Sequence, residues 1–241
     1  MKQRLDVLLV ERGLADTRTK AQAIIMAGKV SGNGRVLDKP GQSFDSETEL
    51  HVKDQSRYVS RAGEKLESVA EYLKLDFTGV TLLDVGSSTG GFTDYALQNG
   101  AFKVYCVDVG TEQLAYKLRQ DSRVVLMEQT DIRNAVLPER ASMVVIDVSF
   151  ISLTRIMEAV AALALPGAPI VAMVKPQFEA GKALADKYHG VLPLGPERDE
   201  VLAGVRMWLG ENGFTILDEA DSGLSGTQGN VERFMLLRYR L

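Results

Sequence analysis

The sequence predicts an α/β protein in which a doubly wound, mostly parallel sheet of seven strands follows a smaller α+β domain. Seven apolar stretches of strand length occur after residue 79, and helical stretches separate most of them. These stretches are apolar without alternation, which is typical of a sheet that helices cover on both faces. The first 65 residues hold 12 Lys and Arg against 9 Asp and Glu, and the remainder holds 16 against 23. We therefore expect the front of the chain to form a separate, basic module. From the pattern of strands and helices, we expect the rest to form a Rossmann-like domain.

The smaller domain is expected over residues 1–58. Leucines at helical spacing predict a helix over residues 3–13, which a glycine can end. Asp16 or Thr17 can cap a second helix that also ends at a glycine. Short β-like pieces joined by Asn-Gly and Pro-Gly turns follow. Two short helices followed by small strands make a compact module.

The larger domain is expected over residues 59–241. It begins with a helix, and further helical stretches include residues 152–165 and 196–213. In such a fold, ligands bind at the carboxyl ends of the parallel strands, so the residues there are the candidate site. The seven expected strands lie within residues 80–86, 102–110, 123–131, 142–150, 168–176, 214–222 and 233–241.

Composition excludes several classes of protein. No apolar run approaches the roughly 18–20 residues that span a bilayer, and charged residues interrupt the N-terminal apolar run, so we expect no signal peptide. The single cysteine, Cys106, cannot form an internal disulfide and is expected to be a buried strand residue, not a nucleophile. We expect a cytoplasmic monomer that does not engage a membrane.

The turn after the first long strand, "LDVGSSTGGFT" (residues 83–93), brings the backbone close to a ligand or to another segment. Gly86 and Gly90 are four residues apart, so the turn is not a G-x-G-x-x-G fingerprint, and no Gly-Lys-Ser/Thr follows to make a P-loop. The pattern Asp-x-Gly-x-x-x-Gly-Gly-Phe resembles the first motif of S-adenosylmethionine-dependent methyltransferases. The resemblance implies that the glycines let the backbone approach the methionine part of the cofactor. NAD binding remains an alternative that lacks its glycine spacing.

Acidic residues end the next two strands. Asp108 is placed to accept both hydroxyls of a ribose, and Asp131 lies beside the expected adenine. The alternative for each is a carboxylate that only caps the following helix. The residues expected to bind the cofactor are Asp84, Gly86, Ser87, Gly90, Gly91, Phe92, Asp108, Asp131 and Ile132.

Four further residues resemble a known catalytic set. Asp147 and Lys175 end the fourth and fifth strands, Glu232 precedes the last strand, and Lys65 begins the helix before the first. A lysine at the end of an apolar strand is unfavourable unless it is paired or functional. The contexts "RYVSRAGEKL", "DVSFISL", "VKPQFEAGK" and "GNVERF" resemble the Lys-Asp-Lys-Glu tetrad of FtsJ-like ribose 2′-O-methyltransferases, in the TlyA branch that is sometimes labelled haemolysins.

The tetrad suits the implied reaction, because a ribose 2′-hydroxyl is a poor nucleophile and needs a base. A lysine can serve if burial and a second ammonium lower its pKa. Lys175 is the candidate base and Lys65 the neighbouring cation. Asp147 would orient Lys175, and Glu232 would hold Lys65 or the substrate ribose. The attack then needs mainly positioning, and no metal is expected.

The front module, "RLDVLLVERGLADTRTKAQAIIMAGKV" followed by "NGRVLDKPG", resembles an S-four-type RNA-binding domain. It departs from the family in having Asp-Thr-Arg where Ser-Arg is common, but the arginine is retained. The resemblance implies methylation of ribosomal RNA, at cytidines, with ribosomal RNA or ribosomal subunits as partners. A membrane-active haemolysin and an RNA-binding protein with an idle methyltransferase domain remain alternatives. The candidate RNA contacts are Arg4, Arg18, Lys20, Arg57 and Arg61.

Overall fold

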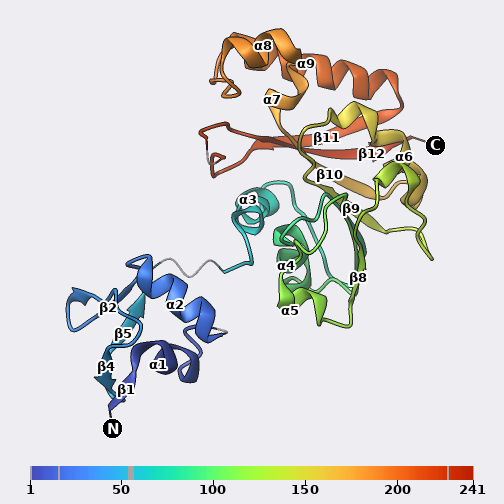
Figure 1. The fold of residues 1–241 in the computed structure, drawn as a ribbon. Coiled ribbons are helices and arrows are strands. Elements are labelled where there is room, and N and C mark those ends of the chain that lie inside the picture. Colours follow the sequence, from blue (N-terminus) through green and yellow to red (C-terminus); the bar gives the residue numbers. More distant parts are fainter. Residues whose placement is uncertain (1, 16, 54–56, 227, 241) are drawn as a thin grey trace. The chain divides into compact units, whose positions relative to one another are not determined.

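The computed structural model describes residues 2–15, 17–53, 57–226 and 228–240. The chain divides into two compact units, Met1–Ser56 and Arg57–Leu241, which Figure 1 shows as a blue part and a part that runs from teal to red. Each unit has its own hydrophobic core, so each is described by itself. In neither unit do the described residues form a helix long and apolar enough to cross a membrane.

The smaller unit contains the two expected helices, α1 (Leu5–Glu11) and α2 (Arg18–Met26). The leucines of α1 face the core because they recur at helical spacing. Thr17 caps α2, since its side chain accepts a hydrogen bond from the backbone N–H of Lys20 at 3.2 Å. Asp16, the other expected cap, lies outside the described residues. The buried leucines of α1 are Leu5, Leu8 and Leu9.

Among the described residues of this unit, five short strands accompany the helices. β2 (Val30–Gly32) pairs with both β3 (Arg35–Val36) and β5 (Leu50–Val52), and β1 (Lys2–Arg4) pairs with β4 (Ser43–Asp45), all antiparallel. The expectation of a helix from residue 3 was wrong at its start, because residues 2–4 form β1. Their partner strand lies about forty residues away, so local periodicity gave no sign of it.

The larger unit is built on the expected seven-stranded sheet, in the order β11-β12-β10-β9-β6-β7-β8. Strands β6 to β10 are parallel to their neighbours within that group, and β12 is antiparallel to both of its neighbours, β10 and β11. All seven strands fall within the stretches that the sequence indicated. They are β6 (Thr81–Val85), β7 (Lys103–Val107), β8 (Val124–Met127), β9 (Met143–Ile146), β10 (Pro169–Val174), β11 (Phe214–Asp221) and β12 (Arg233–Tyr239).

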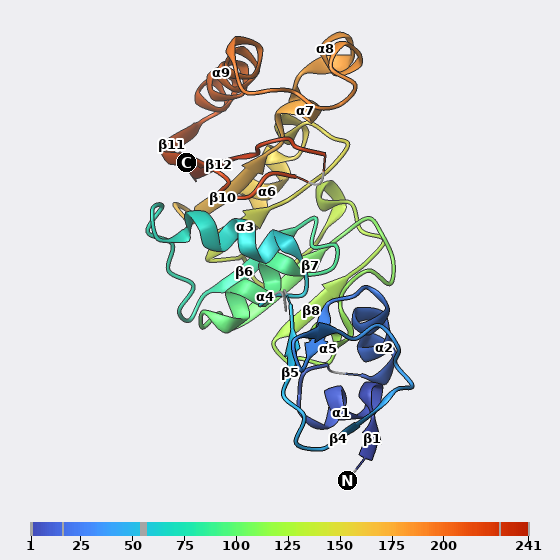
Figure 2. The same cartoon turned by 90° about the vertical axis from the view of Figure 1, so that its left-hand side faces the viewer.

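Helices cover both faces of this sheet (Figures 1 and 2). Because strand side chains alternate in direction, Leu82 packs in the core with α3, α4 and α5, whereas Leu83 packs in the core with α6 and α9. Cys106 is buried in β7, as expected, and burial raises the pKa of its thiol. The helices are α3 (Arg61–Ala70), α4 (Gly91–Gln98), α5 (Tyr116–Arg119), α6 (Met157–Leu163), α7 (Pro176–Glu179), α8 (Gly181–Lys187) and α9 (Pro196–Glu211), with 3₁₀ turns η1 (Ile132–Asn134) and η2 (Leu153–Arg155).

Strand register brings the site residues to one edge of the sheet. Val85 of β6 is paired with Ile146 of β9, so the glycine turn and Asp147 leave the sheet side by side. β12 runs antiparallel to β10, and Val174 is opposite Arg233. The residue after Val174 and the residue before Arg233 therefore emerge at that same edge, where the parallel strands have their carboxyl ends.

Candidate active site

The glycine turn after β6 requires its glycines because the chain packs closely on itself there. Gly86 has φ +80°, and a Cβ on it would lie 2.7 Å from the carbonyl oxygen of Asp147. Gly90 has φ +94°, and a Cβ there would lie 2.3 Å from Leu118 Cδ1. A Cβ on Gly91 would lie 2.3 Å from the hydroxyl of Ser60. Close packing within the protein thus accounts for all three glycines, and Gly90 does not line any of the three cavities described next.

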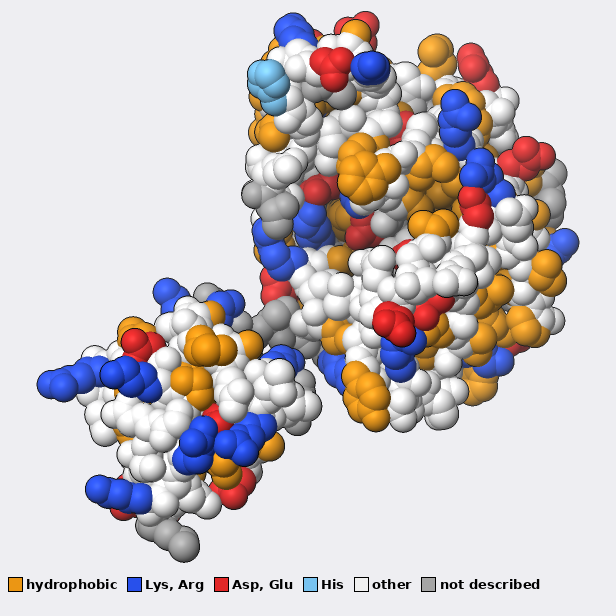
Figure 3. Space-filling view, viewed as in Figure 1, with side chains coloured by type: hydrophobic (Ala, Val, Ile, Leu, Met, Phe, Trp, Pro, Cys, Tyr) orange, Lys and Arg blue, Asp and Glu red, His pale blue; other side chains and the backbone are white. Residues whose placement is uncertain are grey.

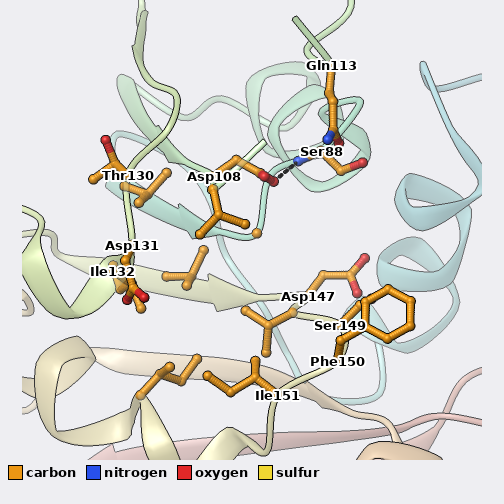
Figure 4. A pocket seen from close by; sticks show the side chains of 16 residues that line it. Ser88, Asp108, Gln113, Thr130, Asp131, Ile132, Asp147, Ser149, Phe150 and Ile151 are labelled. Carbon is orange, nitrogen blue, oxygen red and sulfur yellow. Dashed lines mark hydrogen bonds between the residues drawn. The ribbon is translucent and has the colours of Figure 1, made fainter. Parts of the chain in front are cut away.

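A first cavity, here the Asp108 cavity, opens at the ends of β6, β7 and β9 and has a volume of about 350 Å³. This volume is in the range of small-molecule sites. Asp108 is held there by backbone N–H groups of Ser88 and Gly110, each 2.7 Å from one carboxylate oxygen. Figure 4 shows Asp108 and Ser88 at one end of the cavity, with Asp147 and Phe150 at another. A carboxylate has about four acceptor sites, so Asp108 retains acceptors for a ligand.

Asp131 and Ile132 line the same cavity. Asp131 is also the N-cap of η1, and its carboxylate accepts hydrogen bonds from the backbone and the guanidinium of Arg133. The hydrogen bonds from Arg133 lower the pKa of Asp131 to about 2. The capping alternative is therefore realised for Asp131, while its position still borders the cavity.

A second cavity, here the Asp84 cavity, lies under the glycine turn and is bordered by Ser87, Gly91 and Phe92. Asp84 is buried, and one of its oxygens accepts a 2.6 Å hydrogen bond from the Thr93 hydroxyl. Its other oxygen and the Ser87 hydroxyl have no hydrogen-bond partner among the described residues. Burial raises the pKa of Asp84 to about 7, with a smaller contribution from the charge of Asp147, against the opposing effect of the Thr93 hydrogen bond.

The third cavity, here the lysine cavity, contains all four residues of the expected tetrad as two ion pairs. The Lys175 ammonium lies 2.5 Å from Asp147 Oδ1 and donates to the Ser149 hydroxyl at 2.8 Å. The Lys65 ammonium donates to Glu232 Oε1 at 2.6 Å, with the two side chains only 10% and 4% exposed. Figure 3 shows a hollow in the larger unit where acidic and basic side chains lie among hydrophobic ones.

Asp147 joins the three cavities, because it lines each of them. In the part of the chain that the structure describes, most buried side-chain atoms without a hydrogen-bond partner border the Asp84 and lysine cavities. In the lysine cavity they include Glu232 Oε2 and Gln177 Oε1. Unpartnered buried polar atoms are rare in native proteins and need an explanation. A ligand with donor groups is one such explanation here.

The sequence did not single out three residues that border these cavities. Ser149 fixes Lys175, and Gln177 lies two residues beyond that lysine. Phe150 is 90% exposed with φ +63°, and its ring lies 5.0 Å from that of Phe178. An exposed phenylalanine with positive φ is an outlier that suggests a functional position. Their closeness to Asp147 and Lys175 along the chain was the only available signal.

The candidate RNA contacts are divided between the units. In the smaller unit, Arg4 and Arg18 both bind the carboxylate of Asp6, and Lys20 is exposed on α2. Figure 3 shows lysine and arginine side chains gathered on the visible face of this unit. In the larger unit, Arg57 is paired with Glu67. Arg61 donates to the carbonyl of Ser225 at 2.7 Å and lines both the Asp84 and lysine cavities.

Family models match both units. The model described as FtsJ-like methyltransferase matches residues 58–239, and the model described as S4 domain matches residues 3–50.

Similar proteins cover nearly the whole chain. YqxC of Bacillus subtilis, named as an rRNA methyltransferase with the qualifier "putative", is 46% identical over 99% of this chain and 86% of its own length. The Mycobacterium tuberculosis protein named 16S/23S rRNA (cytidine-2′-O)-methyltransferase TlyA is 40% identical over 98% of this chain and 90% of its own. A solved structure titled "Putative hemolysin from Streptococcus thermophilus" is 43% identical, with a TM-score of 0.75 over 99% of this chain and 89% of that one.

Proposed function

The chain belongs to the FtsJ-like methyltransferase family and carries an S4 domain before the catalytic domain, and on this basis we propose that it methylates a ribose 2′-hydroxyl of ribosomal RNA. One observation carries the proposal: two lysine–carboxylate pairs lie in one cavity, and Asp147 connects that cavity to two others at the strand ends. Cytidine is the proposed target, by analogy with the name of the relative TlyA.

The residues of the Asp84 and Asp108 cavities fit S-adenosylmethionine as the methyl donor. The unpartnered oxygen of Asp84 can accept a hydrogen bond from the α-ammonium of the methionine part. Asp108 retains acceptors for the ribose hydroxyls, and Ile132 gives the neighbouring wall an apolar surface for the adenine. When bound, S-adenosylmethionine supplies an electrophilic methyl group on a sulfonium.

The lysine cavity holds the groups that activate the attacking oxygen. Asp147 and Ser149 fix the amine of Lys175, which, once neutral, accepts the proton of the 2′-hydroxyl. The ammonium of Lys65 stabilises the negative charge that develops on the oxygen. Glu232 keeps that ammonium in place through the 2.6 Å hydrogen bond. Positioning by these two pairs accounts for the chemistry without a metal ion.

Recognition of RNA uses groups outside the tetrad. Only RNA has a 2′-hydroxyl, so the reaction itself selects RNA over DNA. Phe150 lines the Asp108 cavity, and its exposed ring lies 5.0 Å from that of Phe178, which lines the lysine cavity, so a base can stack on it there. Arg4, Arg18 and Lys20 in the smaller unit, with Arg57 and Arg61 in the larger, are the proposed phosphate contacts. We propose a cytoplasmic location for the same reason, since ribosomal RNA is the proposed substrate.

Incubation with methyl-labelled S-adenosylmethionine and purified ribosomal subunits tests the proposal. Label should appear in ribosomal RNA. Absence of label from the RNA of both subunits, and from protein-free ribosomal RNA, would favour an idle methyltransferase domain. Because one similar structure carries a hemolysin title, leakage of dye-filled liposomes should be measured with the same protein, and strong leakage would revive the membrane-active alternative.

A further inference from the structure

In the smaller unit, the carboxylate of Asp6 organises two of the proposed RNA contacts. Asp6 lies in the first turn of α1, and its side chain is fully buried. It accepts hydrogen bonds from Arg4 Nε at 2.9 Å and Arg4 Nη2 at 3.0 Å, from Arg18 Nε at 2.9 Å and from Gln22 Nε2 at 2.8 Å. Its partners come from β1 and α2, which are separate in sequence. These hydrogen bonds, of which those from Arg4 have the largest effect, hold the pKa of Asp6 well below its usual range.

Both arginines remain accessible while they hold this carboxylate. Their side chains are 47% exposed for Arg4 and 55% exposed for Arg18. Arg18 uses only its Nε in the hydrogen bonds to described residues, and Arg4 uses Nε and Nη2. Terminal guanidinium nitrogens of each therefore retain N–H donors, which can bind phosphate oxygens in the geometry that a guanidinium favours.

We propose that Asp6 is a positioning residue for RNA binding, which holds Arg4 and Arg18 as a preformed clamp for the phosphate backbone. The inference rests on the proposed function, because it assumes that this unit binds RNA. An exposed carboxylate beside RNA-binding arginines would repel phosphate, but Asp6 is buried and each of its oxygens is engaged by guanidinium. The cluster keeps a net positive charge. Fixing two long side chains before binding removes part of the entropy that their ordering would otherwise cost.

A double-mutant cycle separates this role from simple stabilisation of the unit. Affinity for purified ribosomal subunits should fall about 10-fold in Asp6→Asn, with kcat and the affinity for S-adenosylmethionine unchanged. In the Arg4→Gln/Arg18→Gln background, the same Asp6→Asn change should alter affinity less than 2-fold, because the groups it positions are gone. An equal loss in both backgrounds would overturn the proposal. Arg35→Gln removes an exposed charge of the same unit as a control, and its effect should add to that of Asp6→Asn.

Arg18→Lys keeps the test valid if Asp6→Asn fails to fold. The lysine retains the charge but cannot hold Asp6 through one edge while presenting a planar fork to phosphate. Affinity for subunits should therefore fall nearly as far as in Arg18→Gln, with the melting temperature close to that of the wild type. Wild-type affinity in Arg18→Lys would contradict the clamp. If the wild-type protein neither binds nor methylates subunits, the proposed function fails instead.

Discussion

The ammonium of Lys175 lies 2.5 Å from Asp147 Oδ1, and Asp147 lines all three cavities at the strand ends. One carboxylate thus holds the proposed base and also borders the proposed cofactor site. This position depends on strand register, because Ile146, the last residue of β9, is paired with Val85 of β6. A shift of this pairing would separate the base from the methyl donor.

Removing one partner of the Lys65–Glu232 pair should destabilise the protein more than replacing both. Activity, in contrast, should require the two charged side chains themselves. Glu232→Gln leaves a buried ammonium without its counter-ion, which should lower the free energy of unfolding by about 3–5 kcal/mol. The double variant Lys65→Met/Glu232→Leu should recover most of that loss and yet remain inactive. Urea unfolding and methyl-transfer assays on the same preparations check both statements.

An exposed pair provides the control. Lys187 and Glu197 are 3.3 Å apart and 58% and 39% exposed, so Lys187→Gln should leave the urea midpoint close to that of the wild type. If the Lys65→Met/Glu232→Leu protein were active, the Lys65–Glu232 pair would have only a structural role.

The stability of the unliganded protein should depend on the ionisation of Asp84. Its pKa is about 7 in the folded protein because it is buried, and its ordinary value is 3.8. The folded state therefore holds a proton that the unfolded chain releases, so wild-type stability should fall as pH rises from about 4 to 7. Asp84→Asn removes the ionisable group and with it this pH dependence of stability. The free energy of unfolding of the variant, measured by chemical denaturation, should rise relative to that of the wild type between pH 5 and pH 8. An equal difference between the two proteins at both pH values would refute this role of Asp84.

Phe150 should serve substrate binding without contributing to the core. It is 90% exposed, so Phe150→Ala should leave the melting temperature nearly unchanged. Loss of base stacking should raise KM for ribosomal subunits about 10-fold. Phe102→Ala is the matched control, because Phe102 is 65% exposed and precedes β7 at the opposite edge of the sheet. Equal KM values for the two variants would remove Phe150 from the substrate site.

The sheet could be predicted from sequence because its strands are continuous apolar runs between helices, and this pattern needs no distant information. β1 could not be predicted, since its partner β4 is about forty residues away and residues 2–4 have no apolar pattern. The packing of Gly90 against Leu118 could not be predicted either, because the two residues come together only in the folded chain. The role of Gly90 in cofactor binding stays a prediction.

The tetrad was indicated by resemblance, but its pairing required the topology. The position of Glu232 beside Lys65 follows from β12 running antiparallel to β10, which residue spacing does not reveal. Phe150 and Gln177 gave no periodic signal, because the exposure of a ring and the burial of an unpartnered amide oxygen are properties of the folded chain.

Mapping the methylated atom with wild-type protein and Lys175→Met tests the central claim most directly. Ribosomal subunits are incubated with each protein and labelled S-adenosylmethionine, and their RNA is digested to nucleosides. The wild type should yield a 2′-O-methylated nucleoside, and Lys175→Met should be at least about 100-fold slower with unchanged cofactor affinity. Lys182→Met, an exposed lysine on α8, should behave as the wild type. A methyl group on a base, or full activity in Lys175→Met, would contradict the account.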